Sequence, residues 1–153
     1  MNRFKGFTLV ELMVAIAIAA ILLMIAMPSF QSIARNNAVR ATTNDLISTI
    51  NLARQQSLNM RTQVEISPAA GGWGNGWGIT FADHAAGEDA NFKPRNNVSV
   101  ISSSGNSSLV FRAKGGIQGG GGIEFNIIHN DDNSITRTIC TSFFGKITHE
   151  GCS

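Results

Sequence analysis

The sequence predicts an α+β protein in which one long N-terminal helix precedes a β-rich head. An apolar run from Phe7 to Met27 is followed, from Phe30 onward, by a stretch with helical periodicity. After Arg61 the pattern changes to short β-branched or alternating runs between glycine and asparagine clusters, which indicates strands and turns. A helix followed by a series of strands is typical of an α+β fold. We therefore expect an antiparallel sheet packed on the second half of the helix.

The apolar run has the length of a membrane-spanning helix. Between Phe7 and Met27 only Thr8 and Glu11 are polar. At a rise of about 1.5 Å per residue, such a run spans roughly 30 Å, the thickness of a bilayer's hydrocarbon core. Arg3 and Lys5 precede the run, and the positive-inside tendency then leaves the short N-terminus in the cytoplasm. Residues 7–28 are thus expected to cross the membrane once.

Three other interpretations of this run compete with a functional one. A cleaved secretory signal could use Ala15-Ile16-Ala17 or Ala17-Ile18-Ala19 as its site, but the apolar run continues well past Ala19. A plain membrane anchor leaves Glu11 unexplained, because an acid at the bilayer centre costs about 3 kcal/mol on insertion scales. A buried helix of a soluble protein is the least favoured of the three. An intramembrane carboxylate by default indicates a functional site with a partner.

The residues before and around Glu11 suggest that partner. The segment Lys5-Gly6-Phe7-Thr8-Leu9-Val10-Glu11-Leu12 resembles the prepilin peptidase site of the type IV pilin superfamily. The resemblance implies a leader of residues 1–6, cleavage between Gly6 and Phe7, and N-methylation of Phe7. It also implies that Glu11 pairs with the N-terminal amine of a neighbouring subunit. Two opposite charges that are costly alone in lipid become tolerable as a pair, so Glu11 would favour docking beside another subunit.

The same resemblance implies a location and partners. The precursor would lie in the bacterial inner membrane as a single-pass protein with its head in the periplasm. It would later join a pilus at the cell surface. Its partners would be the prepilin peptidase, the inner membrane, and other pilins and minor pilins in a filament.

Pilin resemblance further implies that the helix continues past Pro28, although a proline removes one helical hydrogen bond. Residues 29–61 would then form an amphipathic helix with one face of apolar or small residues. Four arginines against one aspartate make this stretch basic, which most often marks a solvated face or one packed against acidic neighbours. The predicted face consists of Ile33, Ala34, Ala38, Ala41, Leu46, Ile50, Ala53 and Ser57.

Residues 62–153 are expected to form the β-rich head. Asn130-Asp131-Asp132-Asn133, between two apolar runs, is typical of a hairpin loop. The predicted strands are Thr62 to Ser67, Gly76 to Phe81, Val98 to Ser102, Ser108 to Arg112, Gly122 to Ile128, Ile135 to Ser142 and Phe144 to Thr148.

The head narrows the resemblance to one group within the superfamily. The segment from Trp73 to Asp83 contains a Trp, a Gly-Trp pair, an apolar-x-Phe and an Asp, and it resembles the GspH/FimT group of minor pilins and pseudopilins. Later residues extend the match: Phe111 with Gly115 and Gly116, then Arg137 ahead of Gly145-Lys146-Ile147.

Strand alternation around the tryptophans has a simple structural explanation. It places Trp77, Ile79 and Phe81 on one face of a strand, so these residues are expected to pack in the core.

Cys140 and Cys152 are the two cysteines of the chain, and both lie near its C-terminus. In the cytosol they would be two thiols, whereas in an oxidising periplasm they are expected to pair. The membrane segment favours the periplasm. A disulfide that closes so short a loop should stabilise the fold by about 3 kcal/mol.

The sequence contains no motif for catalysis or for a cofactor, so we expect neither. Gly72-x-Gly74-x-Gly76 and the glycines at 119–122 lack the strand, helix and Lys-Ser/Thr of a phosphate-binding loop, and flexible turns are the expected structure. His84, His129 and His149 are scattered, and no Cys or His spacing matches a zinc site.

Three functions remain as hypotheses. The first is a structural minor pilin of the initiation or tip complex of a type IV pilus, and the second is a pseudopilin of a type II secretion system. The third is a DNA-binding minor pilin, because some similar proteins bind DNA through a late Gly-Arg-x-Arg. Here the matching stretch keeps Lys146 but has Thr148 in place of the second base. Residues 62–153 contain six basic and eight acidic side chains, whereas phosphate binding needs a concentrated basic patch.

Overall fold

The computed structural model describes residues 7–82, 89–105, 107–120, 122–149 and 151–152, with the backbone alone at residues 26–28. The chain forms two compact units, one ending at Arg35 and the other beginning at Asn36. Helix α1 (Leu9–Met60) contributes to both units and is continuous through Pro28. The proline therefore does not end the helix.

The first unit carries the apolar half of α1. Every side chain from Phe7 to Ile25 is exposed, including all the large hydrophobic ones. The helix is long and apolar enough to cross a membrane, with a mean hydropathy of 2.8 in its most apolar window and none of that window buried. A helix that is apolar all round needs an apolar environment, which this unit does not itself supply.

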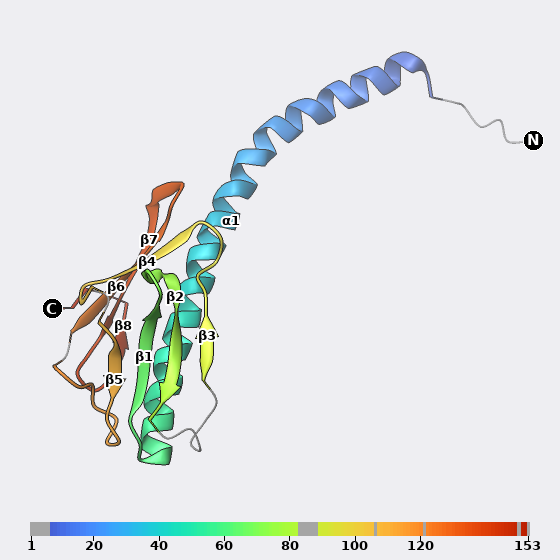
Figure 1. The fold of residues 1–153 in the computed structure, drawn as a ribbon. Helices are drawn as coiled ribbons and strands as arrows, with labels where there is room; N and C mark the ends of the chain where they lie inside the picture. Colours follow the sequence, from blue (N-terminus) through green and yellow to red (C-terminus); the bar gives the residue numbers. More distant parts are fainter. Residues whose placement is uncertain (1–6, 83–88, 106, 121, 150, 153) are drawn as a thin grey trace, which may run out of the picture. The chain divides into compact units, whose positions relative to one another are not determined.

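The second unit consists of the later part of α1 and two four-stranded antiparallel sheets (Figure 1). Sheet A has the strand order β3-β2-β1-β5, and sheet B has the order β4-β6-β7-β8. The strands of sheet A are β1 (Val64–Ala69), β2 (Gly72–Phe81), β3 (Ala90–Phe92) and β5 (Leu109–Phe111). Those of sheet B are β4 (Val98–Ser102), β6 (Ile123–His129), β7 (Asp132–Thr141) and β8 (Ile147–Thr148).

One face of α1 closes the core of this unit. Leu46, Ile50 and Ala53 recur at helical spacing and are fully buried. In Figure 1 this part of the helix runs alongside β1, β2 and β3. Each large aliphatic side chain buried here contributes about 1.5–3 kcal/mol. The core is completed by Val39, Val64, Ile66, Trp73, Trp77, Ile79, Phe81, Val98, Val100, Leu109, Phe111, Ile117, Phe125, Ile127 and Ile139.

Buried hydroxyl groups on this face find partners along the helix. Thr49 Oγ1 donates to the carbonyl oxygen of Asp45 at 2.7 Å and accepts a hydrogen bond from Trp77 Nε1 at 3.1 Å. Thr43 and Ser57 likewise donate to carbonyl oxygens four and three residues earlier. The bond between Thr49 and Trp77 joins α1 to sheet A at the centre of the core.

The predicted α+β fold class is confirmed, and the head contains two antiparallel sheets. The strand predicted at Val98 to Ser102 matches β4, and Trp77, Ile79 and Phe81 are buried as expected. The predicted hairpin loop is also present, since β6 ends at His129 and β7 begins at Asp132.

The prediction of a flexible turn at Gly72-x-Gly74-x-Gly76 is wrong, because these glycines lie within β2. Gly76 has a φ of +128°, and a Cβ there would collide with the carbonyl oxygen of Phe92 on β3. Gly78 is similarly crowded by Asn91 and Ala90. The glycines let β3 approach β2 closely, which is one of their roles within strands.

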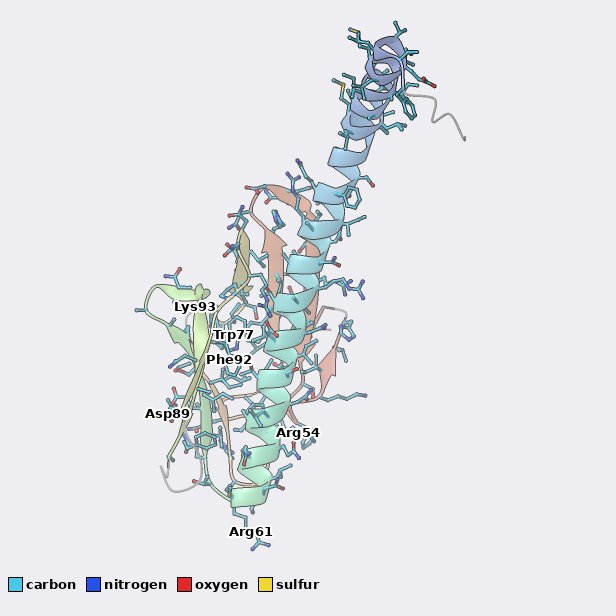
Figure 2. All side chains as sticks on the ribbon, turned by 90° about the vertical axis from the view of Figure 1, so that its right-hand side faces the viewer. Arg54, Arg61, Trp77, Asp89, Phe92 and Lys93 are labelled. Carbon is cyan, nitrogen blue, oxygen red and sulfur yellow. A yellow bond between two sulfur atoms is a disulfide. The ribbon has the colours of Figure 1, made fainter. Side chains whose placement is uncertain are left out.

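Strand β3 was not expected from the sequence, since it is short and Pro94 follows soon after it. Figure 2 shows Phe92 of β3 beside Trp77. Their ring centroids are 6.4 Å apart, with an interplanar angle of 16°.

The last predicted strand, Phe144 to Thr148, is too long. Only Ile147 and Thr148 form β8, because Phe143 and Phe144 occupy a turn.

The predicted face of the second helical stretch is correct in its later part only. Leu46, Ile50, Ala53 and Ser57 are buried, but Ile33 is 52% exposed. Ala34 is also exposed. Both lie in the first unit, before the point at which the head covers α1.

Replacing Thr49 with valine tests the link between α1 and sheet A. Thr49→Val keeps the side-chain shape but leaves Trp77 Nε1 buried without its acceptor, so the free energy of unfolding should fall by about 1–3 kcal/mol. Thr49→Ser retains the hydroxyl and should cost less. Denaturant unfolding of the purified full chain, followed by tryptophan fluorescence, measures both. Equal stability of Thr49→Val and the native chain would contradict this role.

Candidate functional site

The start of α1 contains the residues predicted to be processed. Phe7 is 81% exposed and Thr8 precedes the first helical residue. Thr8 Oγ1 accepts a hydrogen bond from the backbone N–H of Glu11 at 3.2 Å, and its carbonyl oxygen accepts one from the N–H of Leu12. Thr8 is therefore the N-cap of α1. Gly6, the other residue of the predicted cleavage site, lies outside the described residues.

Glu11 stands in the first turn of the helix. Thr8-x-x-Glu11 has the spacing of a capping box, and an acid in the first turn interacts favourably with the helix dipole. This cap was not predicted from the sequence, although the spacing of Thr8 and Glu11 alone indicates it. Glu11 is exposed on an apolar helix surface, and its carboxylate makes no ion pair with any described residue. Within the described part of the chain, the helix N-terminus is therefore the one favourable electrostatic partner of Glu11.

The predicted disulfide is present in the second unit. Cys140, near the end of β7, is bonded to Cys152, and their Cα atoms are 5.2 Å apart. The tail is held further by Glu124 of β6, whose Oε2 accepts a hydrogen bond from the backbone N–H of Cys152 at 3.3 Å. These contacts tie the C-terminal tail to sheet B.

Lys146, the one base retained from the DNA-binding pattern, is exposed on the turn between β7 and β8. This turn is held by hydrogen bonds to Ser142: its N–H donates to the carbonyl oxygen of Lys146 at 2.8 Å, and its carbonyl oxygen accepts from Gly145 at 2.8 Å. Phe143 and Phe144 lie on the same turn and are 43% and 68% exposed. Thr148, where the second base would stand, lies in β8.

A second turn, residues 112–116, lies next to this one. Its ends are joined by one hydrogen bond, from the N–H of Arg112 to the carbonyl oxygen of Gly116 at 2.9 Å. The N–H of Ile117 donates to the carbonyl oxygen of Phe143 at 2.9 Å. A groove of about 230 Å³ is lined by Arg112, Lys114, Gly116, Phe143 and Phe144. We call the four side chains Arg112, Lys114, Phe143 and Phe144 the basic-aromatic surface. This surface was not predicted from the sequence.

The histidines do not gather into a site. His129 is buried, and its Nδ1 accepts a hydrogen bond from the N–H of Asp131 at 3.2 Å. His84 lies outside the described residues. Among the residues that are described, no three His, Cys, Asp or Glu side chains are placed to hold a metal ion.

A long N-terminal helix that is exposed and apolar at first and then packed on antiparallel sheets defines a pilin-like protein. A model of the prokaryotic N-terminal methylation motif matches residues 1–27, and a model described as type II transport protein GspH matches residues 42–145. The chain belongs to the GspH family, within the type IV pilin superfamily. This is a family of structural pilin-like proteins and not a known enzyme family.

Solved structures share the fold. Two crystal forms of the type IV minor pilin FimU of Pseudomonas aeruginosa are similar to this chain. One has a TM-score of 0.63 at 19% identity over 76% of this chain and 90% of that one. The other has a TM-score of 0.58 at 20% identity over 74% of this chain and 93% of that one. No curated protein gives a significant match.

Two glycines with similar backbone conformations provide a matched test of how tightly the Ser142–Lys146 turn is packed. Gly145 has a φ of +70°, and a Cβ there would lie 2.6 Å from Phe111 Cε1 and 3.0 Å from Arg54 Cδ. Gly105 has a φ of +65° with nothing within 4 Å of a Cβ. Gly105→Ala should cost about 1 kcal/mol from backbone strain, and Gly145→Ala about 1–3 kcal/mol more because Phe111 is fully buried.

Denaturant unfolding of the two variants measures this difference in stability. If both alanines cost the same, the turn is not packed against Phe111 as the structure has it.

Proposed function

We propose that the chain is a structural minor subunit of a type IV pilus. It is made as a precursor, cleaved between Gly6 and Phe7, methylated on the new N-terminal Phe7, and then joined to the filament through α1. The observation that carries this proposal is the exposed apolar half of α1, which begins at the Thr8 cap and includes Glu11. No part of the chain that the structure describes covers it. A filament core of similar helices would provide that covering.

Glu11 directs the association of α1 with its neighbours. Cleavage creates a positively charged amine on Phe7, four residues before Glu11. The amine of one subunit pairs with the Glu11 carboxylate of another, which removes the cost of leaving each charge alone in an apolar environment. Because either charge alone is costly there, the pair favours one register of neighbouring helices over others.

Before assembly the precursor lies in the inner membrane, and residues 7–28 span the bilayer. The head, residues 62–153, lies in the periplasm. The amphipathic stretch of residues 29–61 joins the two parts. The disulfide between Cys140 and Cys152 is consistent with this oxidising compartment. In the assembled pilus the head belongs to the initiation or tip complex, where it contacts other minor subunits.

A pseudopilin of a type II secretion system is the second candidate, and the description of the matching family model favours it. The same helix and the same docking charge would then build a shorter filament. The similarity to solved structures of a type IV minor pilin favours the pilus. Deletion of the gene distinguishes the two: loss of surface pili supports the pilus, whereas loss of exoprotein secretion with intact pili supports the secretion system.

DNA binding is the third candidate, and the exposure of Lys146 near Phe143 and Phe144 is the observation in its favour. The excess of acidic over basic residues in the head argues against it. A salt-dependent mobility shift of DNA by the purified full chain at micromolar concentration would put this candidate first.

Replacing Glu11 tests the docking charge. Glu11→Ala and Glu11→Gln should leave membrane insertion and leader cleavage intact, because neither needs the carboxylate. Both should reduce the amount of the protein in sheared filaments about tenfold or more, since the amine of the neighbour would lose its partner. Immunoblots of membrane and filament fractions measure both steps.

Glu11→Asp provides the matched control, because it keeps the charge and the first-turn acid. It should retain more incorporation than the glutamine variant. Normal incorporation of Glu11→Gln would contradict the pairing. Accumulation of uncleaved precursor would instead indicate that Glu11 acts in leader cleavage.

A further inference from the structure

The basic-aromatic surface is not used by the fold or by the N-terminal helix. Phe143 and Phe144 are in edge contact, with ring centroids 5.1 Å apart at 87°, and both remain substantially exposed. Two exposed rings in contact beside a groove form a contiguous apolar patch, and such patches mark interaction sites when polar residues surround them. The other lining side chains, Arg112 and Lys114, are exposed as well.

The surface is preorganised by its backbone. Phe143 and Phe144 are presented by a turn closed by hydrogen bonds between Ser142 and the pair Gly145 and Lys146. Arg112 and Lys114 are presented by a turn in which Gly115 donates to the carbonyl oxygen of Arg112 at 2.7 Å. The bond from Ile117 to Phe143 joins the two turns. Because the backbone is fixed before binding, a partner would lose little free energy in ordering it.

Helix α1 supports the surface from beneath and extends it. Leu58 Cδ2 lies 2.7 Å from the position of a Cβ on Gly115, so this turn rests on the helix. A neighbouring groove of about 240 Å³ is lined by Asn51, Arg54, Gln55 and Leu58. Figure 2 shows Arg54 on the last turns of α1. Its Nε is buried and makes no hydrogen bond within the described part of the chain.

The charges define what the surface would bind. Neither Arg112 nor Lys114 forms an ion pair with a described residue. This local excess of positive charge stands in a head that has more acidic than basic residues overall. A partner that places a carboxylate near the two bases and an apolar side chain on the two rings would complement both features.

The arrangement fits a protein segment better than a nucleic-acid strand. Proteins that bind single-stranded DNA or RNA have a groove along the strand, lined by successive basic side chains and stacking rings. Here two basic side chains and two rings lie together at one place. A small cluster of aromatic and arginine side chains is typical of an interface hot spot. The chemistry therefore favours a compact acidic segment with one apolar anchor.

The two ends of β7 indicate which protein would supply that segment. The strand starts at the hairpin that carries Asp131 and ends at the turn that carries Phe143. Ten residues of strand separate these ends by about 30 Å. Subunits that associate head to tail in a filament bring unlike ends of the same fold together. A neighbouring subunit whose corresponding hairpin carries an acid, as this chain's does at Asp131, would thus offer an acidic end to the basic-aromatic surface.

We propose that the basic-aromatic surface docks an acidic segment with an apolar anchor on the head of a neighbouring pilin-family subunit. The inference rests on the proposed assembly of the chain into a filament. It adds a specific contact of the head to the contact made by α1.

Photo-crosslinking in the native cells tests the proposal with the full-length chain. A benzophenone amino acid at Phe144 should form an adduct with a pilin-family subunit, and mass spectrometry should place the link in a peptide that contains Asp or Glu. The same probe at Val14, on the exposed apolar half of α1, reports filament assembly independently.

Charge reversal supplies the matched variants. Arg112→Glu combined with Lys114→Glu should lower the Phe144 adduct about tenfold. Arg137→Glu changes an exposed base on β7 away from the groove and should leave the adduct unchanged. A lysine in place of the carboxylate in the linked peptide should restore the adduct of the double variant. Formation of the Cys140–Cys152 disulfide in each variant confirms that the head is folded.

The other outcomes overturn the proposal in distinguishable ways. Adducts at Val14 without adducts at Phe144 would leave the filament function standing and remove the docking surface. Adducts at neither position would contradict both the filament function and the docking surface. A nuclease-sensitive adduct at Phe144 would assign the surface to nucleic acid, and a pilin adduct indifferent to charge reversal would remove the role of Arg112 and Lys114.

Discussion

The packing of one face of α1 against the two sheets is the interaction on which the rest of the structure depends. Leu46, Ile50 and Ala53 are fully buried in a core that draws on both sheets. The hydrogen bond between Thr49 and Trp77 fixes the helix to sheet A in the middle of that core. The same continuous helix also carries the exposed apolar segment of the first unit. The two units are therefore linked by one element with two different surfaces.

The sequence was sufficient for the fold class and the core, and insufficient for the glycine-rich strands. Periodicity identified α1, and alternation identified the buried face of Trp77, Ile79 and Phe81, because both patterns come from burial. The prediction for Gly72 to Gly76 was wrong, since a glycine cluster is typical of turns and its role in β2 depends on a neighbouring strand. That strand, β3, is too short to give a pattern of its own.

Some of the candidate sites could be predicted from the sequence, and one could not. Gly6, Phe7 and Glu11 could be selected as candidates because they lie in one short local sequence motif. The disulfide could be expected from the compartment. The basic-aromatic surface could not, because it joins residues 112–114 to residues 143–144 through a hydrogen bond between two turns far apart in sequence. The cap formed by Thr8 was within reach of sequence reasoning, since its spacing to Glu11 is local.

The central claim is that this chain acts as a processed subunit whose mature form begins at Phe7. The intact mass of the protein purified from filaments, with fragmentation of its N-terminus, tests this most directly. The account predicts a chain that lacks residues 1–6 and carries one methyl group on the amine of Phe7. A chain that retains the leader, or one that begins after Ala17 or Ala19 as a secretory signal would require, would contradict it.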